Sequence, residues 1–398
     1  MLRGRGHAVV LDDGVQEVMD GRADVRARPL TLKASRRQHG GRGKSRKARG
    51  QDKIRPNQSR ALTAMTVAKI QHYVPKFLLR NFGTGKKDQL WVFDKASGRS
   101  FQTNAKNVAS ESRFYDFVVD GADHSLEDGL SRIESQAKPV MERILQDDSV
   151  RTIPAQGRAL LAAFLAIQFV RTRAFRMQWE DMRRLLREKI ESMGDHVAPG
   201  SQAEALIRPQ TENEIKIDTA RMILQAPTDF GPHFLNKVWF LAKTTKTHPF
   251  MIGDNPIALQ NHIDMGPYGN LGLGVKGIEI YFPLSSTRAL AMWCPSVAQQ
   301  VAEAAKTLRS LPIQLTASVV RDREGIIALD DALTLGTALP YKSEHVTNFN
   351  SLQVSRSERY VFCSMGDFSL PIRMVADHPI LRAGPRITNI ASKRTSVE

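Results

Sequence analysis

A glutamine and a histidine stand side by side in an otherwise apolar and aromatic segment, QHYVPKFLLRNF at residues 71–82. A buried segment tolerates such a pair only if each polar group finds a partner. The pKa of an ordinary histidine lies near neutrality, so His72 is a candidate general acid or base, with Gln71 beside it as a candidate hydrogen-bonding group. The alternative is a structural histidine whose ring binds the backbone near Pro75.

A second polar pair lies on the apolar sector of a helix expected around residues 159–170. Helical spacing places Gln168 and Arg171 among leucine, phenylalanine and isoleucine side chains. A buried guanidinium needs a carboxylate or an anionic ligand. We therefore expect Arg171, with Gln168, either to stabilise an anion in a catalytic site or to form an internal ion pair.

Three carboxylates are candidate ligands of a divalent cation. Glu127 and Glu134 are seven residues apart, which places them on one helix face at the edge of its apolar stripe. Asp254 ends a strand, and hard cations prefer such oxygen ligands. The alternatives are a solvated flank in which the glutamates pair with Arg132 or Lys138, and a turn in which Asp254 accepts backbone N–H groups.

These residues support two functions of different classes. The first is a metal-assisted hydrolase acting on a phosphodiester, in which His72 transfers protons, Arg171 stabilises the anion and the carboxylates hold the cation. The second is a non-catalytic binding module that recognises an anionic ligand or nucleic acid. Convergence around one open cleft favours the enzyme, whereas a scattered or sealed set indicates that these residues only stabilise the core.

The positive charge is concentrated in the first part of the chain. The net charge is +16, and residues 1–64 carry 16 Lys and Arg against 6 Asp and Glu. The run RRQHGGRGKSRKAR at residues 36–49 cannot bury enough apolar surface to offset its ordering entropy, which predicts a disordered basic arm. Such an arm is a candidate site for nucleic acid. The alternative is an upstream extension outside the native product, with Met65 as the natural start.

No segment has the pattern of a secretory signal or a membrane span. Acidic residues interrupt residues 1–20, and the longest apolar run, residues 159–170, is too short to cross a bilayer. The two cysteines, Cys294 and Cys363, lack metal-binding spacing and are typical of a reducing compartment. We therefore expect a soluble cytoplasmic protein without a membrane partner.

The order of the expected elements predicts an α+β fold, with a central helical region packed on a mainly antiparallel sheet. One domain is expected over residues 65–363, with a C-terminal tail at 364–398. Pro139 is expected to kink or divide the first long helix. The expected strands are 89–94, 114–119, 237–242, 250–253, 277–282, 288–293 and 359–363; helices are expected across 125–225, apart from a loop at 198–209, and at 296–310 and 343–355; strands dominate 234–335.

An ordered set of motifs resembles the domain-of-unknown-function 4238 family. The opening match is the QHYVP motif at residues 71–75, and Gln168, Arg171 and Thr172 match a glutamine–arginine helix of the family. A later strand and turn match as well, although Gly253 stands where the family usually has serine. The resemblance covers most of residues 69–363 and implies no particular activity, substrate or catalytic residue.

Overall fold

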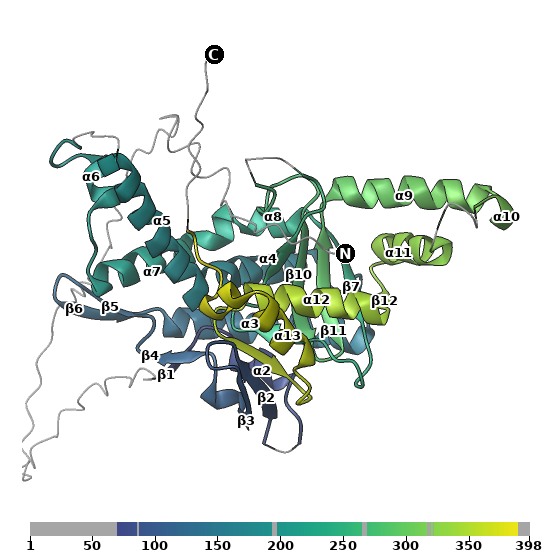
Figure 1. The fold of residues 1–398 in the computed structure, drawn as a ribbon, viewed down its shortest axis with the longest axis horizontal. Helices are drawn as coiled ribbons and strands as arrows, with labels where there is room; N and C mark the ends of the chain where they lie inside the picture. The colour runs from purple at the N-terminus through teal and green to yellow at the C-terminus, as the bar shows by residue number, and fades with distance from the viewer. Residues whose placement is uncertain are drawn as a thin grey trace, which may run out of the picture. The chain divides into compact units, whose positions relative to one another are not determined.

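The computed structural model has an α+β fold, as the order of elements predicted (Figure 1). The predicted arm at residues 1–64 and the last part of the predicted tail lie outside the described residues. The structure describes residues 70–388 apart from residue 86, residues 193–196, 265–268 and 317–319, and residue 321.

A five-stranded sheet in the order β12-β7-β11-β10-β9 positions most of the core. Its neighbouring strands are antiparallel except for β12, which runs parallel to β7. The expectation of a mainly antiparallel sheet is therefore confirmed. The five strands are β7 (Val238–Lys243), β9 (Ala258–Gln260), β10 (Glu279–Ser285), β11 (Arg288–Trp293) and β12 (Ala338–Pro340).

Side chains alternate across this sheet, so its two faces belong to different hydrophobic clusters. On β10, Ile280 and Phe282 pack into the large core with the central helices. Tyr281 packs on the opposite face, with Phe349 and Val346 from a later helix. The sheet is thus covered on both sides.

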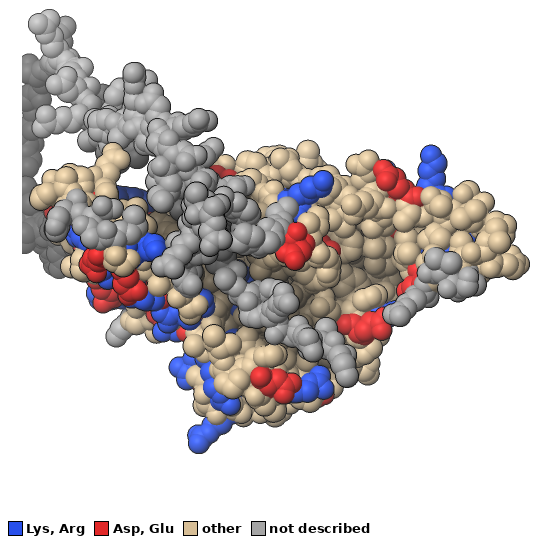
Figure 2. Space-filling model, turned by 45° about the horizontal axis from the view of Figure 1, so that its top comes forward, with Lys and Arg blue, Asp and Glu red and all other residues tan. Residues whose placement is uncertain are grey.

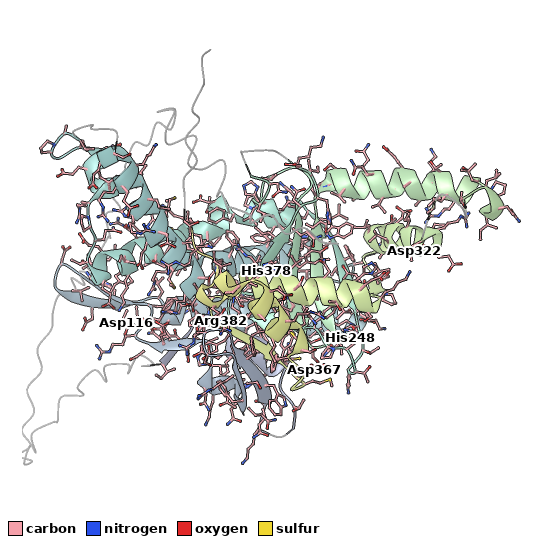
Figure 3. All side chains as sticks on the ribbon, in the orientation of Figure 1. Asp116, His248, Asp322, Asp367, His378 and Arg382 are labelled. Carbon is pink, nitrogen blue, oxygen red and sulfur yellow. The ribbon has the colours of Figure 1, made fainter. Side chains whose placement is uncertain are left out.

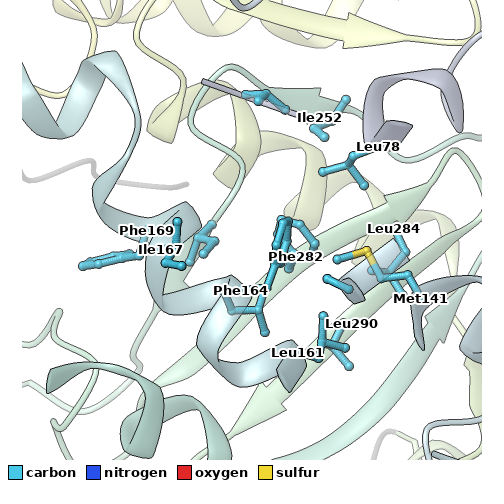
Figure 4. Packing of buried hydrophobic residues seen from close by; sticks show 14 of the residues in the cluster. Leu78, Met141, Leu161, Phe164, Ile167, Phe169, Ile252, Phe282, Leu284 and Leu290 are labelled. Atoms are coloured by element: carbon cyan, nitrogen blue, oxygen red, sulfur yellow. The ribbon is translucent and has the colours of Figure 1, made fainter. Parts of the chain in front are cut away.

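The first face is covered by the central helices, with α4 at their middle. α4 is apolar on nearly all sides, and its Phe164 lies 6.3 Å from Phe282 of β10 between ring centroids (Figure 4). α3 continues through Pro139 without a division. No helix in the described residues is both long and apolar enough to cross a membrane. The helices of the central region are α3 (Glu127–Asp147), α4 (Ala155–Val170), α5 (Arg173–Ser192), α6 (Gln202–Ile207), α7 (Glu212–Asp229) and α8 (Gly231–Leu235). Of these, α6 buries no residue and packs beside α5, away from the sheet.

The second face is covered by helices that follow β11 in the chain. Ala332 and Leu333 of α11 and Val346 and Phe349 of α12 are buried there. The expectation that strands dominate residues 234–335 is wrong for residues 313–335, where the helices α10 and α11 form. The helices of this side are α9 (Pro295–Ser310), α10 (Ile313–Thr316), α11 (Arg323–Leu335) and α12 (Ser343–Arg356).

A four-stranded antiparallel sheet in the order β3-β2-β13-β8 and two two-stranded sheets, β1–β4 and β5–β6, complete the strands. The strands are β1 (Ile70–His72), β2 (Gln89–Asp94), β3 (Arg99–Asn104), β4 (Ser110–Ser112), β5 (Asp116–Val119), β6 (Ala122–Ser125), β8 (Ile252–Gly253) and β13 (Tyr360–Cys363). The short helices α2 (Lys76–Arg80) and η1 (Ala105–Asn107) lie between them in sequence.

Residues 364–388 are part of the folded domain rather than a tail. They form α13 (Ser369–Asp377) and η3 (Pro379–Ala383). Val375 is buried in a cluster with Phe93 of β2. Further on, Arg386 forms a bidentate ion pair with Asp181 of α5, with N–O distances of 2.5 and 2.6 Å. Burial and this pair attach the segment to two distant parts of the domain.

Candidate functional site

Gln71 is fully buried on β1 and binds the segment that leads into β5. Its Oε1 accepts the backbone N–H of Tyr115 at 2.6 Å. Its Nε2 donates to Asp116 Oδ1 at 2.6 Å and to Ser125 Oγ at 3.3 Å. Both ends of the amide are therefore engaged within the protein.

Arg171 follows the last residue of α4 and is only 1% exposed. Its Nη2 donates to the His72 carbonyl oxygen and to Glu134 Oε1, both at 2.7 Å, and its Nε donates to Tyr115 Oη at 3.2 Å. Burial lowers the pKa of Arg171, but Tyr115 and Glu134 together raise it above its ordinary value. Of the two roles expected for Arg171, an anion-binding group or an internal ion pair, the structure shows the ion pair with Glu134.

His72 and Gln168 each keep one buried polar atom without a hydrogen-bond partner, His72 Nε2 and Gln168 Oε1. The amide of Gln168 donates to the carbonyl oxygen of Tyr73 at 3.0 Å. Burial, and then the charge of Lys76, lower the pKa of His72, while a hydrogen bond to the backbone of Lys106 opposes them. The neutral ring is therefore favoured at neutral pH.

Glu127 and Glu134 lie near one another on α3, beside Arg171. Burial raises the pKa of Glu127; the charge of Arg171 lowers it, and Glu134 raises it further. Only Glu134 contacts the guanidinium directly. The pair therefore forms the edge of the Arg171 network.

Asp254 performs a turn role beside this network. Its carboxylate accepts the backbone N–H groups of Glu358, Arg359 and Tyr360 at 2.6–2.8 Å. Burial raises the pKa of Asp254 to about 6, and these backbone hydrogen bonds oppose the rise. Asp254 thereby fixes the connection between α12 and β13.

The structure gathers Gln71, His72, Glu127, Glu134 and Gln168 around Arg171, and Asp254 adjoins this network. Thr172, which follows Arg171, donates to Asn255 Oδ1 at 3.2 Å, and burial and then the charge of Asp254 raise the pKa of Tyr73. Gln71, Gln168 and Arg171 are sealed from solvent, while His72 and the two glutamates are half-buried. Within the described ranges, no group of three or more His, Cys, Asp and Glu side chains is arranged to hold a metal ion. Glu127, Glu134 and Asp254 therefore do not form the shared cation site that the sequence suggested.

A cavity of about 310 Å³ lies on the other side of the five-stranded sheet, between β9–β10–β11 and the helices α11 and α12. Asp322, which caps α11 on this cavity, and Asp116 of the Arg171 network lie in different regions of the molecule (Figure 3). The cavity is lined by Gln260, His262, Glu279, Tyr281, Trp293, Asp322, Gly325, Ile326, Leu329, Leu339, Tyr341, His345, Asn348 and Phe349.

The pairing register of β9, β10 and β11 explains why the sheet wall of this cavity carries polar side chains at one end and small side chains next to them. Glu279 pairs across the strands with Gln260 of β9 and Trp293 of β11, so the three side chains form a row. Tyr281 pairs with Ala258 and Ala291, whose small side chains leave space above the sheet.

Comparison with known protein families matches residues 70–367 to the family described as "Protein of unknown function (DUF4238)". The match covers the Arg171 network and the cavity residues alike. The chain belongs to this family. No curated protein and no solved structure matches the chain.

In this DUF4238 protein, Glu279 is the buried titratable group of the cavity. Tyr281 Oη donates to Glu279 Oε2 at 2.6 Å, and His262 Nε2 lies 3.7 Å from Glu279 Oε1. Burial raises the pKa of Glu279, while the Tyr281 hydrogen bond and the charge of His262 oppose the rise. Burial also raises the pKa of Tyr281 and Tyr341. The cavity thus combines a buried acid with aromatic walls.

Sequence reasoning missed this cavity, although one local signal was present. Glu279 and Tyr281 occupy alternate positions of a strand that was expected at residues 277–282. An acid on the face of a strand that also carries a buried tyrosine requires a partner or a ligand. The other cavity residues come from separate elements, and no motif joins them in the sequence.

Proposed function

We propose that this protein binds a small molecule in the cavity between the five-stranded sheet and the helices α11 and α12. The observation that supports the proposal is a cavity of about 310 Å³ that contains the buried Glu279–Tyr281 pair beside aromatic walls. Apolar walls with a few convergent polar groups are the usual composition of ligand sites. This proposal differs from the binding module inferred from sequence, which was expected to recognise an anionic ligand or nucleic acid.

Filling the cavity tests this proposal. Leu329 lines the cavity from α11, whereas Ala328 is exposed on the same helix. Screening small molecules by thermal shift should find ligands that raise the melting temperature of the wild type and of Ala328→Trp. The same ligands should fail to stabilise Leu329→Trp. A shift that persists unchanged in Leu329→Trp would place the ligand elsewhere.

Metal-assisted hydrolysis of a phosphodiester is the competing proposal. It is supported by the free Nε2 of His72 and by Glu127 and Glu134 at the half-buried edge of the network. The existing ion pair of Arg171 with Glu134 speaks against an anion-binding role for that arginine. Hydrolysis of bis(4-nitrophenyl) phosphate with Mg²⁺ or Mn²⁺, lost in His72→Gln, would favour the enzyme.

Nucleic-acid binding through residues 1–64 is a further proposal, supported by charge alone. Residues 1–64 carry a net charge of +10 out of +16. On the visible face of the described domain, acidic and basic side chains lie interspersed (Figure 2). Deleting residues 1–64 should remove most salt-sensitive DNA affinity. A cytoplasmic location is also proposed, because Cys294 and Cys363 are both free thiols, as is usual in a reducing compartment.

A further inference from the structure

Glu279 is a buried carboxylate with one oxygen left for a ligand. The residue is 6% exposed, and its Oε2 accepts the Tyr281 hydroxyl. Among the described residues, no hydrogen bond reaches its Oε1, and the His262 Nε2 lies 3.7 Å away on a side chain that is 73% exposed. None of the described residues that line the cavity is lysine or arginine. The negative charge of Glu279 is therefore without a fixed cation at close range.

The second carboxylate of the cavity, Asp322, differs because its charge is already engaged. Asp322 accepts the backbone N–H of Gly325 at 2.9 Å, which caps α11, and it forms an ion pair with Lys342. An acid at the start of a helix is also favoured by the helix dipole. Of the two carboxylates, Glu279 is therefore the one that is free to form an ion pair with a cationic ligand.

Aromatic side chains surround the space next to Glu279. Trp293 stands beside it across the strands, and Tyr281, Tyr341 and Phe349 line the same cavity. The rings of Tyr281 and Phe349 are 5.9 Å apart at 82°, an edge-to-face arrangement. Aromatic faces attract organic cations through their quadrupoles, and the attraction strengthens when water is excluded.

We propose that the cavity selects a small organic cation, with its ammonium group against Glu279 and its apolar part against the aromatic walls. This inference rests on the proposed binding function and adds the ligand class. A neutral ligand would leave the carboxylate unbalanced, and an anionic ligand would place like charges together in a partly desolvated site. The volume lies at the low end of the range for ligand sites, which favours a compact amine.

A charge series on the full-length protein tests the ligand class without any substitution. The probes are 2-phenylethylamine, 2-phenylethanol and 3-phenylpropionate, which share a ring and differ mainly in charge. Calorimetric titration at pH 7.5 should give an affinity for the amine at least about ten-fold above that for either other probe, equivalent to about 1.4 kcal/mol. Equal or tighter binding of the alcohol or the acid would overturn the cation assignment and leave the binding function intact. Failure of all three probes at millimolar concentration would overturn both.

Glu279→Gln then tests the residue, with Glu344→Gln as the matched control. Glutamine keeps an acceptor for the Tyr281 hydroxyl but removes the charge. Glu344 is an exposed acid on α12 outside the cavity lining, so its substitution changes the net charge equally. We expect Glu279→Gln to lose at least about ten-fold in amine affinity and Glu344→Gln to lose less than two-fold. Equal losses in the two variants would assign the selectivity to general surface charge and overturn the role of Glu279.

Discussion

Arg171 binds His72 through the main chain: its Nη2 donates to the His72 carbonyl oxygen at 2.7 Å, while the histidine ring hydrogen-bonds the backbone of Lys106. The arginine therefore fixes the position of β1 whatever side chain occupies position 72. The adjacent Gln71 holds the other side of the same strand through Tyr115 and Asp116. The QHYVP motif is thus explained in large part by packing.

Replacing Arg171 should be strongly destabilising. Arg171→Ala removes the bonds to the His72 carbonyl and to Tyr115, and it leaves Glu134 unpaired in a partly buried position. We expect the free energy of unfolding, measured by urea denaturation, to fall by about 3–5 kcal/mol. Arg143→Ala is the control, because its ion pair with Asp147 is exposed and contributes at most about 0.5 kcal/mol. A loss below about 1 kcal/mol for Arg171→Ala would contradict the network.

His72 should titrate below the ordinary histidine pKa of about 6.5. Burial and Lys76 lower its pKa, so the folded state binds a proton less tightly than the unfolded state. His72 therefore contributes fully to the free energy of unfolding above pH 6.5, and this contribution is lost as pH falls through the lowered pKa of the folded state. Ring-proton NMR titration measures the shift, and His72→Gln should remove this part of the acid sensitivity. A measured pKa of 6.5 or higher would refute the prediction.

Asp254 should give the opposite pH dependence. Burial raises its pKa to about 6, so its folded state binds a proton more tightly than the unfolded state. Its contribution to the free energy of unfolding is fully present below the unfolded pKa of about 3.8 and is lost as pH rises through about 6. A shift of two pKa units corresponds to about 3 kcal/mol at most. We expect Asp254→Asn, followed by denaturation between pH 4 and 7.5, to flatten the profile relative to the wild type. Parallel profiles for the two proteins would show that Asp254 is not shifted.

Gly253 should resist replacement by serine, the residue that the resemblance to the family implies at this position. A Cβ at this position would lie 3.0 Å from the Gln353 carbonyl oxygen and 3.0 Å from Ser357 Cβ. We expect Gly253→Ser to destabilise by about 1–3 kcal/mol through overpacking, as measured by thermal denaturation. Adding Ser357→Gly removes one of the two close contacts and should recover part of the loss. Full tolerance of the single substitution would mean that the α12–β13 connection shifts easily.

Local pattern predicted the elements that carry a strong period or a clear boundary. Residues 89–94 were expected as a strand, and β2 runs from Gln89 to Asp94. The apolar run at 159–170 became α4, and α9 and α12 begin and end within one residue of the helices expected there. In each case the hydrophobic pattern and the flanking residues favoured the same element.

Other elements were missed because their signals were overlooked or because burial decided them. α11 has cap signals, Asp322 before it and Gly336 in the left-handed conformation after it, yet it lay in a region expected to be strands. α6 formed within residues expected to be a loop, with Ser201 as its cap. α13 depends on burial against Phe93, about 280 residues earlier, which no local pattern reveals.

The site was predictable only where a polar residue broke an apolar pattern. That reasoning identified Gln71, Gln168 and Arg171, which the structure places in one buried network. It did not distinguish a sealed network from an open site, because both require the same residue types. The cavity residues come from four strands, two helices and their connections, so their meeting depends on sheet register and on helix placement.

The alternation along β10 separates the positions that form the core from the positions that line the cavity. Glu279 and Tyr281 face the cavity, whereas Ile280 and Phe282 face the core with α4. Substitutions at the odd-numbered positions can alter the chemistry of the cavity while the even-numbered positions preserve the fold. Inserting or deleting a single residue here would exchange the two sets and place a carboxylate in the core. Point substitutions in this strand can therefore change the lining of the cavity without disturbing the core, while insertions and deletions are expected only in the turns on either side.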